Sequence, residues 1–311
     1  MAEESCKLCR PVPRETLGLL VYLVIAFGGA WAIELIPVRA IGYGSPKSGN
    51  AVLFWLIGVM YVPMLAALVA RKVEGCGFAD SGLHWGRGRY HLVAWLLPAV
   101  LGVVATGLTL ALGLGTYDPG LSTIMSRVPP EGQEFVRQQT ARFGAWLPVI
   151  IWVSALTQAV LINCVATFGE EFGWRGYLQR RLERFGVRAS VLLTGLIWGV
   201  WHAPIVAQGH NYPGHAALGV PLFIVFCTVW SVILGWLRNA SGSVWAPTIA
   251  HASMNGPAVA PMMFVKGANV LVANFVGVVG IVLAGLFAAY LLAAGVIRRP
   301  VDQPPVCETE S

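Results

Sequence analysis

Eight stretches of this chain are apolar and long enough to cross a lipid bilayer, whose hydrocarbon core is about 30 Å thick. They lie at approximately 16–36, 51–70, 92–114, 145–169, 190–207, 219–237, 243–264 and 270–297. Backbone inside a bilayer must satisfy its own hydrogen bonds, and apolar segments of this length do so as helices. The sequence therefore predicts an all-α, polytopic membrane protein of about eight transmembrane helices.

Acidic residues are almost absent from these stretches. The chain is 56% hydrophobic and 12% charged, and of its 15 Asp and Glu residues only Glu34, Glu170 and Glu171 fall inside or at the edge of a span. A soluble protein with eight buried helices would scatter more charge along them, so the composition excludes the soluble globular class. Glu34 falls in the last turn of the first span, where we expect its carboxylate to reach water.

The basic residues predict an orientation. Eight crossings place both chain ends on one side, and with the N-terminus inside, 15 of the 21 Lys and Arg residues lie on the inner side. Positive residues favour the cytoplasm, so we expect a multi-pass protein of the cell membrane with both termini cytoplasmic. The net charge of +6 then reflects topology and contact with anionic lipid, and no nucleic-acid partner is expected. The six cysteines fall on the inner side or within spans, so no disulfide framework is expected.

Two adjacent carboxylates and an arginine close the fourth predicted span. Carboxylates at the edge of a membrane segment are costly and are usually retained for a function. In a helix, Glu171 and Arg175 are four residues apart and share a face, so they can form an ion pair. Glu170 points about 100° away from Glu171, so it is not paired with Arg175 and is free to take part in chemistry.

Further polar residues occur on two later spans. His202 lies in the fifth, and His251 and Asn255 lie four apart on one face of the seventh. An intramembrane polar cavity holding carboxylate, imidazole and amide groups suits hydrolysis. Glu170 would take a proton from water with help from His202, His251 and Asn255 would stabilise the oxyanion, and Arg175 would orient the acidic pair.

The depths of these residues conflict with the predicted spans. At about 1.5 Å per residue, Glu170 lies near the inner edge of the fourth span and His202 roughly 18 Å into the fifth. They meet only if the spans tilt, start later, leave a deep cavity, or if 170–188 dips into the membrane. The simpler interpretation of 179–188, with its four arginines, is a basic amphipathic segment at the inner interface.

Three motifs resemble those of one protein family. They are Glu-Glu-x-Gly-Trp-Arg-Gly-Tyr-Leu at 170–178, Trp-Gly-x-Trp-His-x-Pro at 198–204 and His-x-x-x-Asn at 251–255. In order and spacing they resemble the CAAX protease and bacteriocin-processing family of Abi-type intramembrane endopeptidases, which includes the type II CAAX prenyl proteases. The resemblance covers roughly 145–260. Trp198 departs from the phenylalanine common in eukaryotic CAAX proteases, which puts a CAAX substrate in doubt but not the catalytic assignment.

The resemblance implies roles for the motif residues. Glu170 would be the catalytic base assisted by His202, His251 and Asn255 would form the oxyanion site, and Arg175 would hold Glu171. Members have been called metalloproteases, and a metal-free glutamate mechanism is also argued for them. We favour a reaction that requires no cofactor. Zinc or another divalent metal on Glu170, His202 and His251 stays an alternative, although the chain lacks a His-Glu-x-x-His motif.

The predicted organisation has five parts. They are a cytoplasmic tail at 1–15, a three-helix scaffold with an outer loop at 16–144, a catalytic core at 145–264, a last helix at 265–297 and a cytoplasmic tail at 298–311. The expected partners are the lipid bilayer and a peptide or protein substrate in the membrane, cut near the cytoplasmic face. Alternatives are a bacteriocin-immunity or regulatory member acting on another membrane peptide, and a transporter carrying protons on Glu and His. The oligomeric state is left open.

Overall fold

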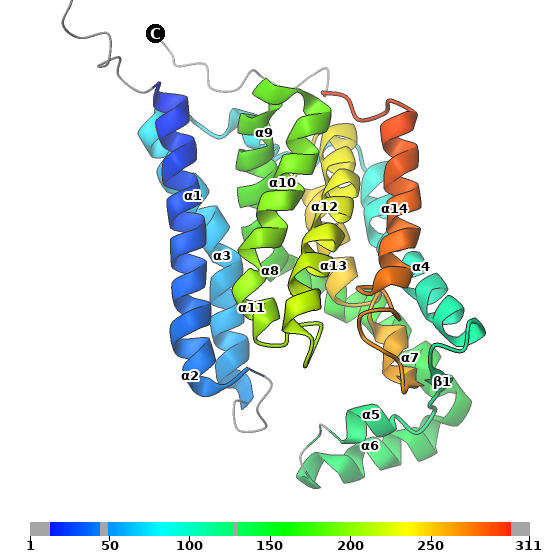
Figure 1. The fold of residues 1–311 in the computed structure, drawn as a ribbon. Coiled ribbons are helices and arrows are strands. Elements are labelled where there is room, and N and C mark those ends of the chain that lie inside the picture. The colour runs from blue at the N-terminus through cyan, green and yellow to red at the C-terminus, as the bar shows by residue number, and fades with distance from the viewer. Residues whose placement is uncertain (1–12, 44–48, 127, 129, 300–311) are drawn as a thin grey trace, which may run out of the picture.

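The computed structural model is an all-helical bundle, as the sequence predicts, and it describes residues 13–43, 49–126, 128 and 130–299. Figure 1 shows the long helices side by side, with the start of α1 and the end of α14 at one end of the bundle. The two predicted tails lie almost wholly outside the described residues. The long helices are α1 (Arg14–Ile33), α3 (Gly49–Glu74), α4 (Arg89–Ala111), α8 (Val160–Gly173), α10 (Val187–Trp201), α12 (Ala216–Ser241), α13 (Trp245–Asn255) and α14 (Val278–Ala293).

Shorter elements connect or extend these helices. They include the π-helical turns η1 (Glu34–Val38), η4 (Ala155–Ala159) and η5 (Trp174–Leu178), and the 3-10 turns η2 (Ala79–Ser81), η3 (Gly144–Trp146), η6 (Glu183–Phe185) and η7 (Ala260–Phe264). The remaining helices are α2 (Arg39–Ile41), α5 (Ser122–Met125), α6 (Pro130–Phe143), α7 (Leu147–Ser154), α9 (Gln179–Leu182) and α11 (Ala203–Ala207). The strands β1 (Thr116–Tyr117) and β2 (Val265–Lys266) pair antiparallel.

The described part of the chain contains five helices long and apolar enough to cross a membrane. They match the first four predicted spans and the sixth. Two shorter apolar helices, α10 and α14, match the fifth and eighth. The seventh span, predicted at 243–264, is wrong in length, because α13 ends at Asn255 and 256–264 continue as turns. The protein is thus a multi-pass, all-α membrane protein.

The predicted end of the fourth span at 169 is also wrong. The helical path continues from α8 through η5, α9 and η6 to Phe185. The arginines that made this region resemble a surface segment are partly inside the protein, since Arg180 and Arg181 are buried while Arg184 and Arg188 are exposed. Ion pairs neutralise the buried ones, so they do not end the span.

A buried ion network holds this extension against α3. Arg181 pairs with Glu74 at 2.6 Å and with Asp80 at 2.5 Å. Asp80 also accepts a hydrogen bond from Arg71, and the Tyr177 hydroxyl donates to Glu74 at 2.6 Å. Burial raises the pKa of Asp80, but the guanidiniums of Arg71 and Arg181 outweigh this and hold its pKa below the usual range. The network therefore joins the end of α3 and the η2 turn to the continuation of α8.

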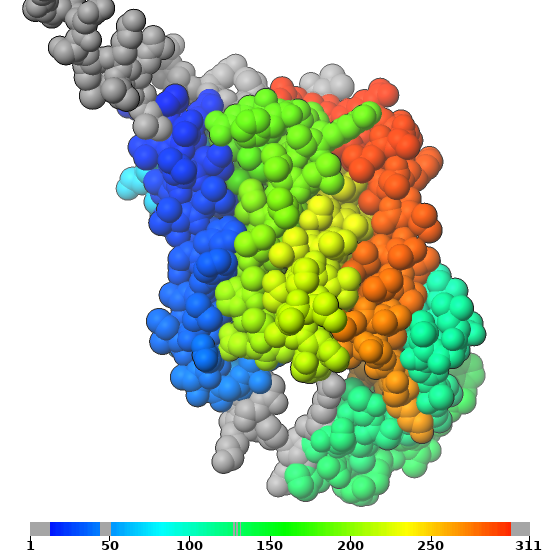
Figure 2. Space-filling view, viewed as in Figure 1, coloured from blue at the N-terminus to red at the C-terminus, as the bar shows by residue number. Residues whose placement is uncertain are grey.

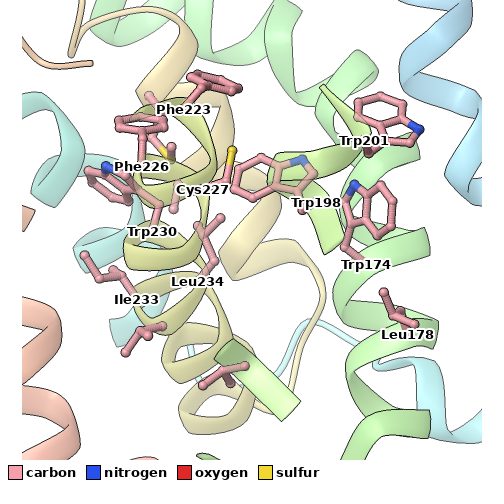
Figure 3. Packing of buried hydrophobic residues seen from close by; sticks show 14 of the residues in the cluster. Trp174, Leu178, Trp198, Trp201, Phe223, Phe226, Cys227, Trp230, Ile233 and Leu234 are labelled. Carbon is pink, nitrogen blue, oxygen red and sulfur yellow. The ribbon is translucent and has the colours of Figure 1, made fainter. Parts of the chain in front are cut away.

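Aromatic side chains fill the centre of the bundle. Trp174, Trp198 and Trp201 lie together on the η5 and α10 side, and Phe223, Phe226 and Trp230 of α12 lie opposite (Figure 3). In the space-filling view the bundle is continuous, and α5 and α6 cover part of the end opposite the start of α1 (Figure 2). No disulfide framework was expected from the sequence. In the structure Cys76 is disulfide-bonded, while Cys164 and Cys227 are free thiols.

Replacement of Arg181 by Gln should destabilise the protein strongly. The change leaves Glu74 and Asp80 buried with less compensating charge, which costs about 3–5 kcal/mol when one partner of a buried pair is removed. The matched control is Arg137→Gln, which breaks an exposed pair with Glu134 and should cost less than about 1 kcal/mol. Thermal unfolding of the detergent-purified variants measures both. Equal midpoints for Arg181→Gln and the wild type would contradict the role of the network.

Acid should weaken the same network. Because folding lowers the pKa of Asp80, its contribution to stability is complete above the unfolded value of about 3.9 and is lost as pH falls through the folded value.

Candidate active site

The candidate residues of α8 and α10 lie at the same depth because the two form a hairpin. The helical path from α8 ends at Phe185, Gly186 turns the chain with a φ of 97°, and α10 runs back. Glu170 precedes Gly186 by 16 residues (186 − 170) and His202 follows it by 16 (202 − 186). Each arm is roughly 24 Å long at about 1.5 Å per residue. The conflict in depth found from the sequence came from ending the fourth span too early.

Glu171 is the centre of a buried charged cluster. Its Oε1 accepts hydrogen bonds from Arg175 Nη1 at 2.8 Å and from His251 Nδ1 at 2.9 Å. The Glu171–Arg175 pair confirms the helical spacing read from the sequence, and both side chains are fully buried. The contact with His251, 80 residues later in the chain, was not predicted. Glu171 therefore has two partners that hold it in place.

Glu170 is held by two indoles and not by a cation. Trp198 Nε1 donates to its Oε2 at 2.8 Å, and Trp174 Nε1 approaches the same oxygen at 3.4 Å. Within the part of the chain that the structure describes, Oε1 of Glu170 has no hydrogen-bond partner. The carboxylate is oriented through one oxygen, and the other is left for a proton or a water.

Trp198 links the separate parts of the cluster. The Arg175 guanidinium lies over its ring at 4.6 Å. The rings of His202 and His251 meet it edge to face, at centroid distances of 5.6 and 5.2 Å. Trp198, which departs from the phenylalanine of the eukaryotic motif, thus has a structural role that the sequence did not predict. Its spacing four residues before His202 was the available signal, because it places both on one face of α10.

His202 and His251 are both held by a hydrogen bond at Nδ1. His202 Nδ1 is 2.9 Å from the carbonyl oxygen of Trp198, which fixes Nδ1 as the donor. His251 Nδ1 donates to the Glu171 carboxylate in the same way. In each neutral ring, Nε2 is then an acceptor. The His202 ring also lies against the apolar rings of Trp201 and Phe223.

Asn255 is less closely connected than the other candidates. It ends α13 one turn after His251, and its side chain is exposed while that of His251 is buried. The structure thus brings Glu170, Glu171, Arg175, His202 and His251 into one contact network through Trp198. Asn255 shares only the face of α13.

Glu34 corrects an expectation. Its side chain is 1% exposed and does not reach water, and its Oε2 has no partner among the described residues. It lies in η1, close enough to Glu170 for the two charges to interact. Its main-chain oxygen accepts a hydrogen bond from Gln208 Nε2 just beyond α11. A third carboxylate therefore faces the cluster from the first helix of the chain.

The donors present do not form a ready metal site. Among the described residues, no three His, Cys, Asp or Glu side chains lie together as metal ligands would. Glu170 Oε2 and the Nδ1 atoms of both histidines have hydrogen-bond partners, so only Glu170 Oε1 and the two Nε2 atoms are left as possible ligands. We therefore derive no step through a metal ion.

Residues 151–257 match a family model described as type II CAAX prenyl endopeptidase, Rce1-like. This core resembles the CAAX proteases. The match contains all six candidate residues, and it supports an intramembrane endopeptidase of the CAAX type in general. Glu34, Glu74 and Asp80 lie outside it. No match to a curated protein was found.

Close helix packing behind the site depends on two glycines of α8. A Cβ on Gly169 would lie 2.7 Å from the Met60 carbonyl oxygen, and one on Gly173 would lie 2.6 Å from the Pro63 carbonyl carbon. These are backbone atoms of α3, which cannot move as a side-chain end can. The small-x-x-x-small spacing thus allows α3 to approach the helix that carries both glutamates.

Gly173→Ala should therefore push α8 from α3 and lower both the unfolding temperature and the activity. Gly58→Ala on α3 is the matched control, because a Cβ there meets nothing within 4 Å. Thermal unfolding and peptide cleavage of both variants give the comparison. A Gly173→Ala protein as stable and active as Gly58→Ala would show that the contact is not required.

Proposed function

We propose that the protein hydrolyses a peptide bond of a membrane-associated peptide near the cytoplasmic face, using a water activated by Glu170. The observation that carries the proposal is the unequal environment of the two adjacent glutamates. Glu171 is paired through Oε1 with Arg175 and His251, and its Oε2 has no partner among the described residues, whereas Glu170 meets only neutral indole N–H groups, through Oε2. A free, oriented carboxylate is what a general base requires.

The reaction would begin at Oε1 of Glu170. This oxygen takes a proton from a water as the water oxygen forms a bond to the carbonyl carbon of the peptide. His202 Nε2 is an acceptor in the neutral ring and would hold the second hydrogen of the same water. The carbonyl π electrons move to oxygen and give a tetrahedral oxyanion.

His251 and Asn255 would stabilise that oxyanion. His251 would donate from Nε2 when both ring nitrogens carry protons, with Nδ1 bonded to the Glu171 carboxylate. The Asn255 amide lies one helical turn away on the same helix and would supply the second donor. The oxyanion then collapses, the C–N bond breaks, and Glu170 returns its proton to the leaving amine. The products are a peptide carboxylate and an amine, and no group is left changed.

Glu170→Gln should lower peptide cleavage by at least the roughly 100-fold typical of a lost general base, with little change in folding. Glu171→Gln should instead lower the unfolding temperature, because Arg175 and His251 lose their shared buried partner. We would measure cleavage of CAAX peptides, with and without a prenyl group, per folded, detergent-purified protein.

Glu134→Gln serves as the control, because its carboxylate is exposed on α6. A normally folded but inactive Glu171→Gln, together with an active Glu170→Gln, would reverse the two roles.

The cytoplasmic placement of both chain ends is also part of this proposal. The excess of Lys and Arg at that end supports it. The disulfide at Cys76 lies at the same end and argues for an oxidising compartment instead. The two observations make opposite predictions for cysteine accessibility.

A membrane-impermeant maleimide applied to intact cells should decide between them. In a background without native cysteines, Glu134→Cys should be labelled and Lys72→Cys protected, because these exposed residues mark the two ends of the bundle. Labelling of Lys72→Cys with protection of Glu134→Cys would invert the topology.

A further inference from the structure

A pocket lies between α4, α12 and α14. Its volume is about 500 Å³, and it shares no lining residue with the Glu170 cluster. Figure 1 shows α12 and α14 side by side, and the pocket lies near the end of the bundle where both of them finish. That is the depth at which lipid headgroups meet the ends of membrane-spanning helices.

Three arginines give the pocket a positive rim. They are Arg87, Arg298 and Arg299, each of them exposed. Arg299 Nε bonds to Glu183 Oε2 at 2.8 Å, and Arg298 Nε donates to the Gly295 carbonyl oxygen at 2.7 Å. Glu183 is also paired with Arg180, so the acid does not cancel the charge of the rim.

A buried amide lies deeper in the same lining. Asn239 is 4% exposed, and its Oδ1 accepts a hydrogen bond from Gln179 Nε2 at 3.1 Å. Its Nδ2 has no hydrogen-bond partner among the described residues. A buried donor without an acceptor costs free energy, and an acceptor supplied by a ligand would remove that cost.

Aromatic rings form the walls. Tyr90 meets Trp236 edge to face at 5.8 Å, Trp236 meets Phe287 at 5.9 Å, and Phe287 stacks on Tyr290 at 6.3 Å. Tyr and Trp side chains are typical of the membrane interface, since one end is apolar and the other polar. Below them, Val282 and Leu286 leave an exposed apolar surface on α14, along which an acyl chain can lie.

We propose that this pocket binds the headgroup of one anionic phospholipid, with its acyl chains running along α14. The three guanidiniums complement a phosphodiester, and basic pockets between helices at the interface select anionic headgroups. Aromatic walls alone would also suit a choline group. The three arginines oppose a second cation, so phosphatidylglycerol fits and phosphatidylcholine does not.

The test is a lipid titration of the full chain in detergent by native mass spectrometry. Phosphatidylglycerol and phosphatidylcholine with identical acyl chains are the probes. The wild type should bind phosphatidylglycerol at least tenfold more tightly. Arg298→Gln with Arg299→Gln should weaken it by about fivefold per arginine. The matched control, Lys72→Gln with Arg184→Gln, removes two exposed charges outside the pocket lining and should bind as the wild type does.

Three results would overturn the proposal. They are unchanged binding by the double arginine variant, an equal loss in the control, and displacement of the lipid by inorganic phosphate alone, which would make this an anion site. If the double variant unfolds, Arg298→Gln alone decides, because its guanidinium bonds only to a backbone oxygen among the described residues.

Discussion

A charge inside a membrane-spanning bundle has to be compensated, and this requirement organises the whole protein. Glu171 is compensated by Arg175 and His251, which fixes α8 against α13. Arg181 is compensated by Glu74 and Asp80, which fixes the continuation of α8 against α3. The ion pairs that offset the cost of burying these charges are thus also the contacts that set the helix positions. Glu170 differs from these groups, because only neutral N–H donors hold it.

The sequence predicted the class of fold, but not the contacts between residues far apart in the chain. Apolar length identifies membrane spans because it depends only on local residues. The Glu171–Arg175 pair was predictable for the same reason, since helical spacing is local. The end of the fourth span was not, because Arg181 is neutralised by Glu74, 107 residues away. The burial of Glu34 and the bond between His251 and Glu171 likewise depend on tertiary packing.

The family match covers the motifs but not all the helices that pack against them. Residues 151–257 carry the motifs, yet α1 and α3 supply the surface against which they pack. Trp201 Nε1 donates to the Ala26 carbonyl oxygen, and Trp31 Nε1 donates to that of Trp201, so α1 is bonded to α10 next to the candidate site. The N-terminal helix α1 therefore helps to hold α10 in place, although the motifs lie elsewhere.

The lengths of the two arms of the hairpin around Gly186 fix the relative positions of Glu170 and His202. Two arms of 16 residues bring Glu170 and His202 level. One residue inserted into a single arm would rotate that partner by about 100° and shift it by about 1.5 Å, which would separate the pair. Arms lengthened together would keep the pair but carry it deeper into the bilayer. The depth of the Glu170–His202 pair in the bundle is thus set by the length of the segments that join these residues to the turn at Gly186.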